Sequence, residues 1–291
     1  MNLWSALRSR VALLAPLDRD PLARRDPAFI DQELQWLGPL TDAWYRPRIE
    51  GLEHIPDGPS LIVGMHNGGT MSPDMFTTMV AFWRRFGSAR PAYGLAHDDV
   101  FRSRPLAAWL GKLGAVPAHQ RNARALVERG ASVLVYPGGD LDAFKPWRER
   151  HRVKFGERVG FVRTALATGV PIVPVVSVGA HETIAVLTDG QRIVRALGLS
   201  ALTRAKVMPV MLCLPWGVWV GPWEAHLPMP SALHIRVLPP LKVELPPSAI
   251  DDERALATVR DQVQAAMQAE VDRLVAAGGF GVRARLRQLI G

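Results

Sequence analysis

Residues 61–74 read LIVGMHNGGTMSPD, an apolar run that turns abruptly into a polar, glycine-rich segment. The apolar run is typical of a buried strand, and Ser72 followed by Pro73 is typical of the N-cap and first position of a helix. His66 therefore stands at a strand end, and Asp74 falls in the first helical turn. An imidazole and a carboxylate so placed can meet across the loop, an arrangement suited to removing a proton from a hydroxyl group.

Strand-like and helix-like patterns alternate along the rest of the chain. Apolar runs predict strands at residues 61–65, 132–136, 172–178 and 233–238, and helical periodicity predicts helices at residues 27–44, 73–86, 122–129 and 157–168. A last helix is expected after Asp251, ending before Gly278. This alternation predicts an α/β fold with a mostly parallel central sheet covered by helices.

The 291 residues, 48% of them hydrophobic, are enough for one large core, and no linker or internal repeat interrupts them. We therefore expect one domain over residues 1–291. It would comprise an N-terminal helical segment (1–50), an α/β core that carries His66 (51–245), and a C-terminal helix with a basic tail (246–291).

Charge and cysteine content narrow the class of partner. The chain has 35 Lys and Arg against 27 Asp and Glu, a net charge of +8, which favours anionic partners such as phospholipid, nucleic acid or phosphorylated substrates. It shows no basic recognition helix or RNA-binding aromatic motif, so we expect no nucleic acid.

The single cysteine, Cys213, excludes an internal disulfide. No residues at metal-ligand spacing occur, and we expect no metal.

Two segments indicate where in the cell the protein is located and whether it contacts a membrane. Residues 1–18 lack the pattern of an export signal, which favours retention in the cytoplasm. Residues 207–223 carry no charge, but prolines and glycines interrupt them, and they contain Trp216, Trp219 and Trp223. Tryptophan favours the boundary between membrane and water. We interpret this segment as a monotopic or hydrophobic-groove element facing a membrane, with a plain buried core piece as the alternative.

A second constellation, VLVYPGGD, occupies residues 133–140. A strand that runs into Pro-Gly-Gly leaves bare backbone at Gly138 and Gly139, which can approach an oxyanion or a phosphate. Cations follow, among them Arg148, Arg150 and Lys154, and they could contact a phosphate or instead form a solvated loop. Farther upstream, Arg121 stands just before a predicted helix, where it could clamp a phosphate.

Taken together and in this order, the motifs resemble the glycerolipid acyltransferase superfamily, the PlsC-like lysophospholipid acyltransferases. The resemblance covers residues 61–178. Its blocks correspond to His66 with Asp74, Gly114–Arg121, Tyr136–Gly139 and Val170–Pro174. The motif YPGGD, followed by GFVR at residues 160–163, is most similar to the branch near diacylglycerol acyltransferases and plant phytyl ester synthases.

The resemblance implies a glycerol-3-phosphate acyltransferase-like fold and transfer of a fatty acyl group from a thioester to a glycerolipid hydroxyl. His66 would be the general base, and Asp74 would orient it and stabilise the imidazolium. The acyl donor would be acyl-CoA or acyl-carrier protein, with no bound cofactor. Oxyanion candidates are Gly68 and Gly69. The expected substrate or phosphate contacts are Arg121, Gly138, Gly139, Asp140, Arg148, Arg150 and Lys154.

The sequence departs from the family pattern in two places. Seven residues rather than four separate His66 from Asp74, so the loop is longer. Gly138 stands where many phosphatidate-forming members have a glutamate that helps to bind the acceptor. This second departure favours a neutral acceptor such as monoacylglycerol or diacylglycerol, with a lysophospholipid still open.

Two other classes of function compete with a transferase. A non-catalytic lipid-binding protein that keeps the fold would explain the basic charge and the tryptophans. A lipid ester hydrolase would need a Gly-x-Ser-x-Gly elbow, and the nearest segment, around Ser177, lacks the first glycine. The expected partners are an anionic membrane surface, lipid substrates and an acyl donor. The expected location is the cytoplasmic face of the membrane, as a peripheral or monotopic protein.

Overall fold

The computed structural model describes residues 20–191, 194, 207–221 and 226–290. The expectations for residues 1–18 and for Trp223 lie outside the described residues.

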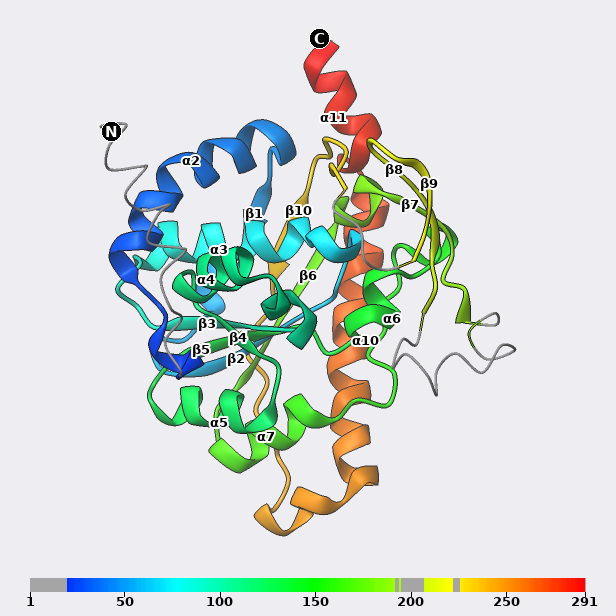
Figure 1. The fold of residues 1–291 in the computed structure, drawn as a ribbon. Coiled ribbons are helices and arrows are strands. Elements are labelled where there is room, and N and C mark those ends of the chain that lie inside the picture. The colour runs from blue at the N-terminus through cyan, green and yellow to red at the C-terminus, as the bar shows by residue number, and fades with distance from the viewer. Residues whose placement is uncertain (1–19, 192–193, 195–206, 222–225, 291) are drawn as a thin grey trace.

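A seven-stranded sheet forms the centre of the molecule, in the order β1-β10-β6-β2-β5-β3-β4 (Figure 1). Strands β2 to β6 run parallel to one another, while β10 pairs antiparallel with β6, and β1 runs parallel to β10. The strands are β1 Arg48–Glu50, β2 Ser60–Gly64, β3 Ala92–Ala96, β4 Ala115–Pro117, β5 Ser132–Val135, β6 Ile172–Val178 and β10 His234–Val237. The predicted mostly parallel sheet is confirmed.

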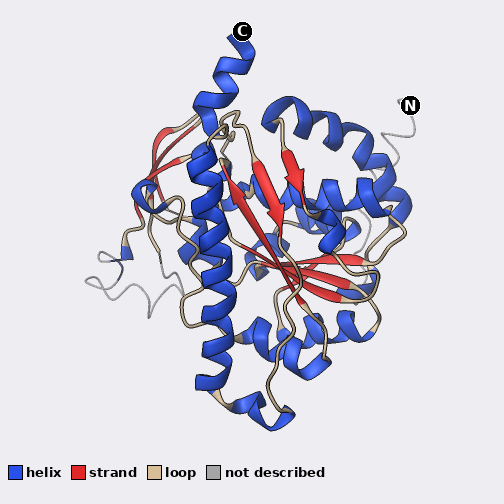
Figure 2. Cartoon of the chain, turned by 180° about the vertical axis from the view of Figure 1, so that it is seen from behind, coloured by secondary structure: helices blue, strands red, loops and turns tan. Residues whose placement is uncertain are grey.

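Helices cover both faces of this sheet, and β2 shows why. Leu61 and Val63 point into a core formed with helices α5, α7 and α10, whereas Ile62 between them points into a second core formed with α2 and α3. Figure 2 shows the long helix α10 running beside the sheet. The helices are α2 Pro27–Tyr45, α3 Pro73–Phe86, α4 Arg104–Lys112, α5 Gln120–Glu128, α7 Gly160–Thr168 and α10 Glu253–Ala277.

Helix α3 begins at Pro73, as the sequence predicts, but Ser72 does not cap it through its side chain. Ser72 adopts a left-handed backbone conformation with φ of 37°, and its hydroxyl makes no cap hydrogen bond. A side-chain N-cap normally has an extended backbone, from which its oxygen reaches the amides of the first turn. The hydroxyl is turned toward the loop that carries His66 instead.

The uncharged segment after residue 207 folds as a β-hairpin. Strands β8 (Val210–Cys213) and β9 (Gly217–Val220) pair antiparallel, and β7 (Ala185–Thr188) completes a separate three-stranded sheet. Its inner face packs on Phe144, just after the short helix α6 (Gly139–Ala143). None of the helices in the described ranges has the length and apolarity needed to cross a membrane.

Candidate active site

The loop that follows β2 carries His66 to the carboxyl edge of the parallel strands, where open α/β sheets usually bind ligands. The imidazole is half-buried and packs edge-to-face on Tyr136, with the ring centroids 5.4 Å apart. The Ser72 Oγ lies 3.2 Å from both ring nitrogens of His66. This hydroxyl donates a hydrogen bond to the Gly69 carbonyl, which leaves its oxygen able to accept one from the imidazole.

The backbone of His66 is held on both sides by a buried ion pair. The His66 amide donates to Asp142 Oδ2 at 2.6 Å, and the Lys145 ammonium donates to the His66 carbonyl at 3.2 Å. Asp142 and Lys145 also pair with each other at 2.6 Å, and the side chains of both are fully buried. A charged pair without water makes strong directional contacts, so it fixes the place where His66 leaves the strand.

The role of Asp142 and Lys145 was not predicted from the sequence. Lys145 is the first cation of the run that also holds Arg148, Arg150 and Lys154, and Asp142 follows Asp140 in what reads as a polar turn. Their spacing of three residues beside the start of a helix was the available signal. Because lysine is seldom buried, the composition of the segment suggested solvent exposure instead.

His181 also contacts the loop that carries His66. Its Nδ1 accepts a hydrogen bond from the Gly68 amide at 3.3 Å, and its Nε2 lies 2.8 Å from the Lys145 carbonyl, to which it can only donate. Burial lowers the pKa of His181 well below its usual value, so the ring is neutral. His181 therefore has a structural role, and the Gly68 amide, an oxyanion candidate, is already engaged in this structure.

Asp74 is buried in the first turn of α3 and accepts three hydrogen bonds. The donors are Asn67 Nδ2 at 3.0 Å, Ser177 Oγ at 2.9 Å and the Met75 amide at 2.9 Å. Burial raises the pKa of Asp74 to about 7, against the opposing effect of Asn67 and Ser177. Over the described residues, no hydrogen bond joins Asp74 to the His66 ring, so the carboxylate is linked to His66 through its neighbour Asn67.

Electrostatics keep His66 in the form that accepts a proton. Burial lowers the pKa of His66 to about 4, and the positive charge of Lys145 acts in the same direction. The ring is therefore neutral at physiological pH. A neutral imidazole that is only half-buried is a competent general base, although a low pKa also makes it a weaker one.

The glycines of the two predicted turns are required by close packing. A Cβ on Gly138 would lie 2.2 Å from the Lys154 carbonyl oxygen and 2.3 Å from the Asp142 Cβ. A Cβ on Gly139 would meet the Arg158 guanidinium, and Gly139 also has a φ of +50°. The glycine at position 138 thus lets the Asp142 side chain lie under the turn.

Replacing Gly138 by alanine is expected to reduce the free energy of unfolding by about 1–3 kcal/mol, because the new methyl overlaps backbone that cannot move aside easily. The matched control is Gly58→Ala, where nothing lies within 4 Å of the added Cβ, and a change within about 0.5 kcal/mol is expected. Urea unfolding of both variants measures the difference. Equal stabilities for the two variants would contradict the packing argument.

The predicted substrate or phosphate contacts differ in whether their charge is already paired with an opposite charge. Arg148 and Lys154 both pair with Glu149, and Arg150 lies 3.9 Å from Glu182 while stacking on Trp147. Asp140 pairs with Arg158 at 3.0 Å. Arg121 is exposed in the first turn of α5, and no ion pair or hydrogen bond joins its side chain to another described residue. Of the four predicted cationic contacts, Arg121 is the one with an uncommitted charge.

Ser177 does not form a hydrolase elbow. It lies inside β6, it is 4% exposed, and its hydroxyl donates to Asp74. A nucleophilic serine of that class stands on an exposed turn between a strand and a helix. The structure thus removes the sequence feature on which the hydrolase alternative depended.

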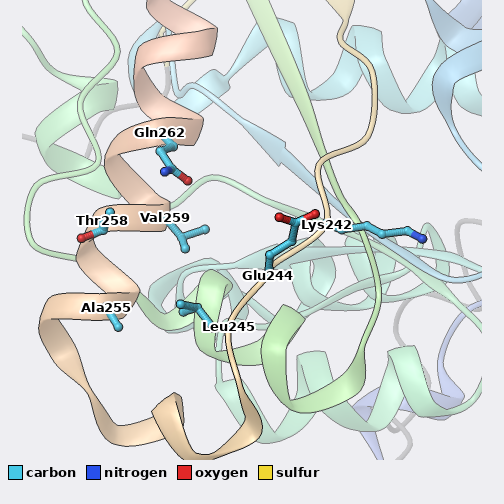
Figure 3. A pocket seen from close by; sticks show the side chains of 7 residues that line it. All are labelled: Lys242, Glu244, Leu245, Ala255, Thr258, Val259 and Gln262. Carbon is cyan, nitrogen blue, oxygen red and sulfur yellow. The ribbon is translucent and has the colours of Figure 1, made fainter.

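A surface depression between α10 and residues 242–245 is unrelated to this site (Figure 3). Leu241, next to it, pairs with Ile172 at the start of β6, whereas His66 follows the end of the parallel strand β2. The depression therefore lies toward the opposite edge of the sheet. The described ranges contain no group of three or more His, Cys, Asp or Glu side chains arranged to hold a metal.

The fold is that of a PlsC-like acyltransferase. The structure of the 1-acyl-sn-glycerophosphate (LPA) acyltransferase PlsC from Thermotoga maritima superposes with a TM-score of 0.54, over 94% of this chain and 89% of that one, at 18% sequence identity. Residues 46–178 match the family model described as Acyltransferase. The resemblance to the glycerolipid acyltransferase superfamily is confirmed.

Two curated relatives extend the comparison. An uncharacterized protein of Mycobacterium tuberculosis is 30% identical over 236 residues, which are 80% of this chain and 63% of that protein. The chain thus spans somewhat less than two thirds of this relative. Phytyl ester synthase 1, chloroplastic, of Arabidopsis thaliana is 29% identical over 147 residues, covering 48% of this chain and 20% of the plant protein.

Proposed function

We propose that this protein is an O-acyltransferase that moves a fatty acyl group from an acyl thioester to a hydroxyl group of a glycerolipid. The observation that carries the proposal is the neutral, half-buried His66 at the carboxyl edge of the parallel strands, within the residues that match the acyltransferase family model. Its backbone is fixed on both sides by Asp142 and Lys145. Such a group can take a proton from a hydroxyl without being displaced by the incoming substrate.

In the proposed reaction, a His66 ring nitrogen accepts the proton of the acceptor hydroxyl while its oxygen attacks the thioester carbonyl carbon. The tetrahedral intermediate then collapses with cleavage of the carbon–sulfur bond, and the imidazolium returns its proton to the departing thiolate. The acyl group passes directly to the acceptor. Asp74 is the supporting acid of this step, because its negative charge, when ionised, favours the imidazolium.

The acceptor is proposed to be a lysophospholipid or a monoacylglycerol or diacylglycerol, with acyl-CoA or acyl-carrier protein as donor. Support for a neutral acceptor comes from Gly138, where the turn has no room for the glutamate that many phosphatidate-forming relatives carry. The name of the Arabidopsis relative, a phytyl ester synthase, points to an uncharged alcohol in that protein. Arg121 is the proposed contact for a phosphate on either donor or acceptor.

The test is acyl transfer from long-chain acyl-CoA and acyl-carrier protein to a panel of lysophosphatidate, other lysophospholipids, monoacylglycerol and diacylglycerol. We expect transfer to at least one acceptor, with the neutral glycerides preferred over lysophosphatidate. No transfer from either donor by folded protein would overturn the proposal. That result would favour a lipid-binding protein, for which the missing hydrogen bond between His66 and Asp74 is the supporting observation.

The pH dependence of kcat/KM tests the role of Asp74. Its pKa of about 7 predicts that kcat/KM rises as the pH increases through about 7, because only the ionised carboxylate stabilises the imidazolium. His66, with a pKa of about 4, adds no step in this range. Asp74→Asn should lower kcat/KM and abolish the rise. A wild-type profile that is flat through neutral pH would remove the ionised carboxylate from the mechanism.

A further inference from the structure

The outer face of the hairpin β8–β9 is apolar and exposed, while β7 places the exposed Thr188 opposite Val210 at its margin. In the pairing register, Leu212 lies opposite Val218, and Val210 lies opposite Val220, so these side chains share one face. Leu212 is 43% exposed, Val218 63% and Val220 58%. The turn between the strands adds Leu214 and Trp216, β7 adds Leu187, and Leu227 pairs with Leu214 in an isolated bridge. All four are exposed. We call the seven exposed residues of this set the apolar face: Leu187, Leu212, Leu214, Trp216, Val218, Val220 and Leu227.

An exposed sheet face of this kind is not the usual solution in water. Antiparallel sheets that face solvent on one side alternate buried apolar with exposed polar residues. Here Met211 and Cys213 point inward as expected, but the outward positions between them are apolar as well, and residues 207–221 contain no charged side chain. Contiguous apolar surface of this sort marks an interaction site.

The apolar face is coupled to the loop of His66 through the inner face of the same sheet. Ile184, Val186, Met211 and Cys213 pack on Phe144. The Phe144 ring approaches Gly69, at 3.2 Å from the position its Cβ would take, in the loop that carries His66. A molecule that docks on the outer face is therefore one sheet thickness away from the proposed catalytic loop.

Basic residues flank the apolar face. The short helix η6 (Trp147–Glu149) packs against β7 and exposes Trp147 together with Arg148. The Arg148 side chain is 80% exposed and lies 3.5 Å from Glu149, an exposed pair weak enough to be exchanged for a phosphate. Helix α11 (Gly281–Ile290) packs against the turn that leads into β7, and Figures 1 and 2 both show it beside this sheet. Its exposed residues include Arg283, Arg287 and Leu286.

We propose that the apolar face and its basic flanks bind the surface of an anionic bilayer, with Trp216 and Val218 entering the interfacial region and Arg148 contacting lipid phosphates. Charge complementarity selects this occupant, because apolar and tryptophan side chains partition into the interface while adjacent arginines attract anionic headgroups. A second copy of the chain would bring the same arginines toward each other. Attachment is peripheral and does not depend on acyl transfer.

Co-sedimentation of the full chain with vesicles tests the proposal without any activity measurement. We expect binding to vesicles of phosphatidylcholine with phosphatidylglycerol, and at least about tenfold weaker binding for the variant Trp216→Ser/Val218→Ser, since it loses two buried side chains at the interface. The matched control is Leu241→Ser, an exposed leucine toward the opposite edge of the main sheet, which should bind as wild type does. Thermal unfolding confirms that each variant is folded.

A charge variant separates the two parts of the surface. Arg148→Gln is expected to weaken binding to the anionic vesicles severalfold and to leave binding to pure phosphatidylcholine unchanged. Wild-type protein that ignores anionic vesicles would overturn the proposal, as would an apolar-face variant that binds like Leu241→Ser. A dimer in solution that Val218→Ser dissociates, without vesicle binding by wild type, would assign the face to a second copy instead.

Discussion

Replacing His66 by glutamine is expected to lower kcat for acyl transfer by about 10²–10⁴-fold, the usual contribution of a positioned general base. Glutamine keeps the size and polarity of the side chain but cannot accept the hydroxyl proton at neutral pH. The backbone of residue 66 is held by Asp142 and Lys145 through main-chain atoms, so the loop should keep its conformation in the variant. The loss should therefore fall on kcat more than on KM.

The control for this variant is His54→Gln. Among the described residues, the His54 side chain makes one hydrogen bond, between its Nδ1 and the Val237 carbonyl, in the turn after β1. That turn lies at the edge of the sheet opposite His66, because β1 runs antiparallel to the strand that carries His66. We expect near wild-type kcat for His54→Gln. If His66→Gln retained wild-type kcat with the best acceptor, His66 would not be the base.

Replacing Lys145 by methionine is expected to give a second large effect, a loss of about 3–5 kcal/mol in the free energy of unfolding. Methionine matches the length of the lysine stem but leaves Asp142 buried without its counter-ion, and the 0% exposure of both side chains leaves no water to replace it. The His66 carbonyl also loses its donor. Urea denaturation at neutral pH measures the change.

Two comparisons make this result specific to the buried pair. The double variant Asp142→Asn/Lys145→Met removes both charges and should recover most of the lost stability, since a buried ion pair replaced as a whole is often nearly neutral. Arg124→Met breaks an exposed pair with Glu128 and should cost less than about 1 kcal/mol. A double variant no more stable than Lys145→Met would show that the charges themselves are not the cause.

The elements most completely predicted were those with strong local signals. Helix α3 spans the predicted residues 73–86, and β6 spans the predicted 172–178. Helix α3 has a helical hydrophobic period and a proline at its start, whereas β6 is a short continuous apolar run between Pro171 and Gly179, so short-range physics determines both. The hairpin β8–β9 was missed, because an uncharged apolar segment interrupted by prolines and glycines has no period that distinguishes a strand from a membrane-facing segment.

The site, like the fold, was predictable from the sequence only where local signals mark a residue. His66 and Asp74 were recognised from their places at a strand end and a helix start, and both lie there. Their connection was not predicted correctly in detail, because Asn67 and Ser177 occupy the carboxylate that was expected to face the imidazole. Ser177 is 103 residues away in sequence from Asp74, and no local pattern reports a contact at that separation.

By itself, the sequence determined the α/β class, the family motifs and the position of His66 at the carboxyl edge of a strand. These follow from periodicity, turn chemistry and the order of the blocks along the chain, all of which act over a few residues. Only the tertiary structure decided which partners meet: the Asp142–Lys145 pair on the His66 backbone, the His181 bond to Gly68, and the hairpin whose apolar face lies outward. Burial and pairing depend on which distant segments pack together. In this fold the packing buries Lys145, a member of a basic run, where it holds the backbone of the loop that carries His66.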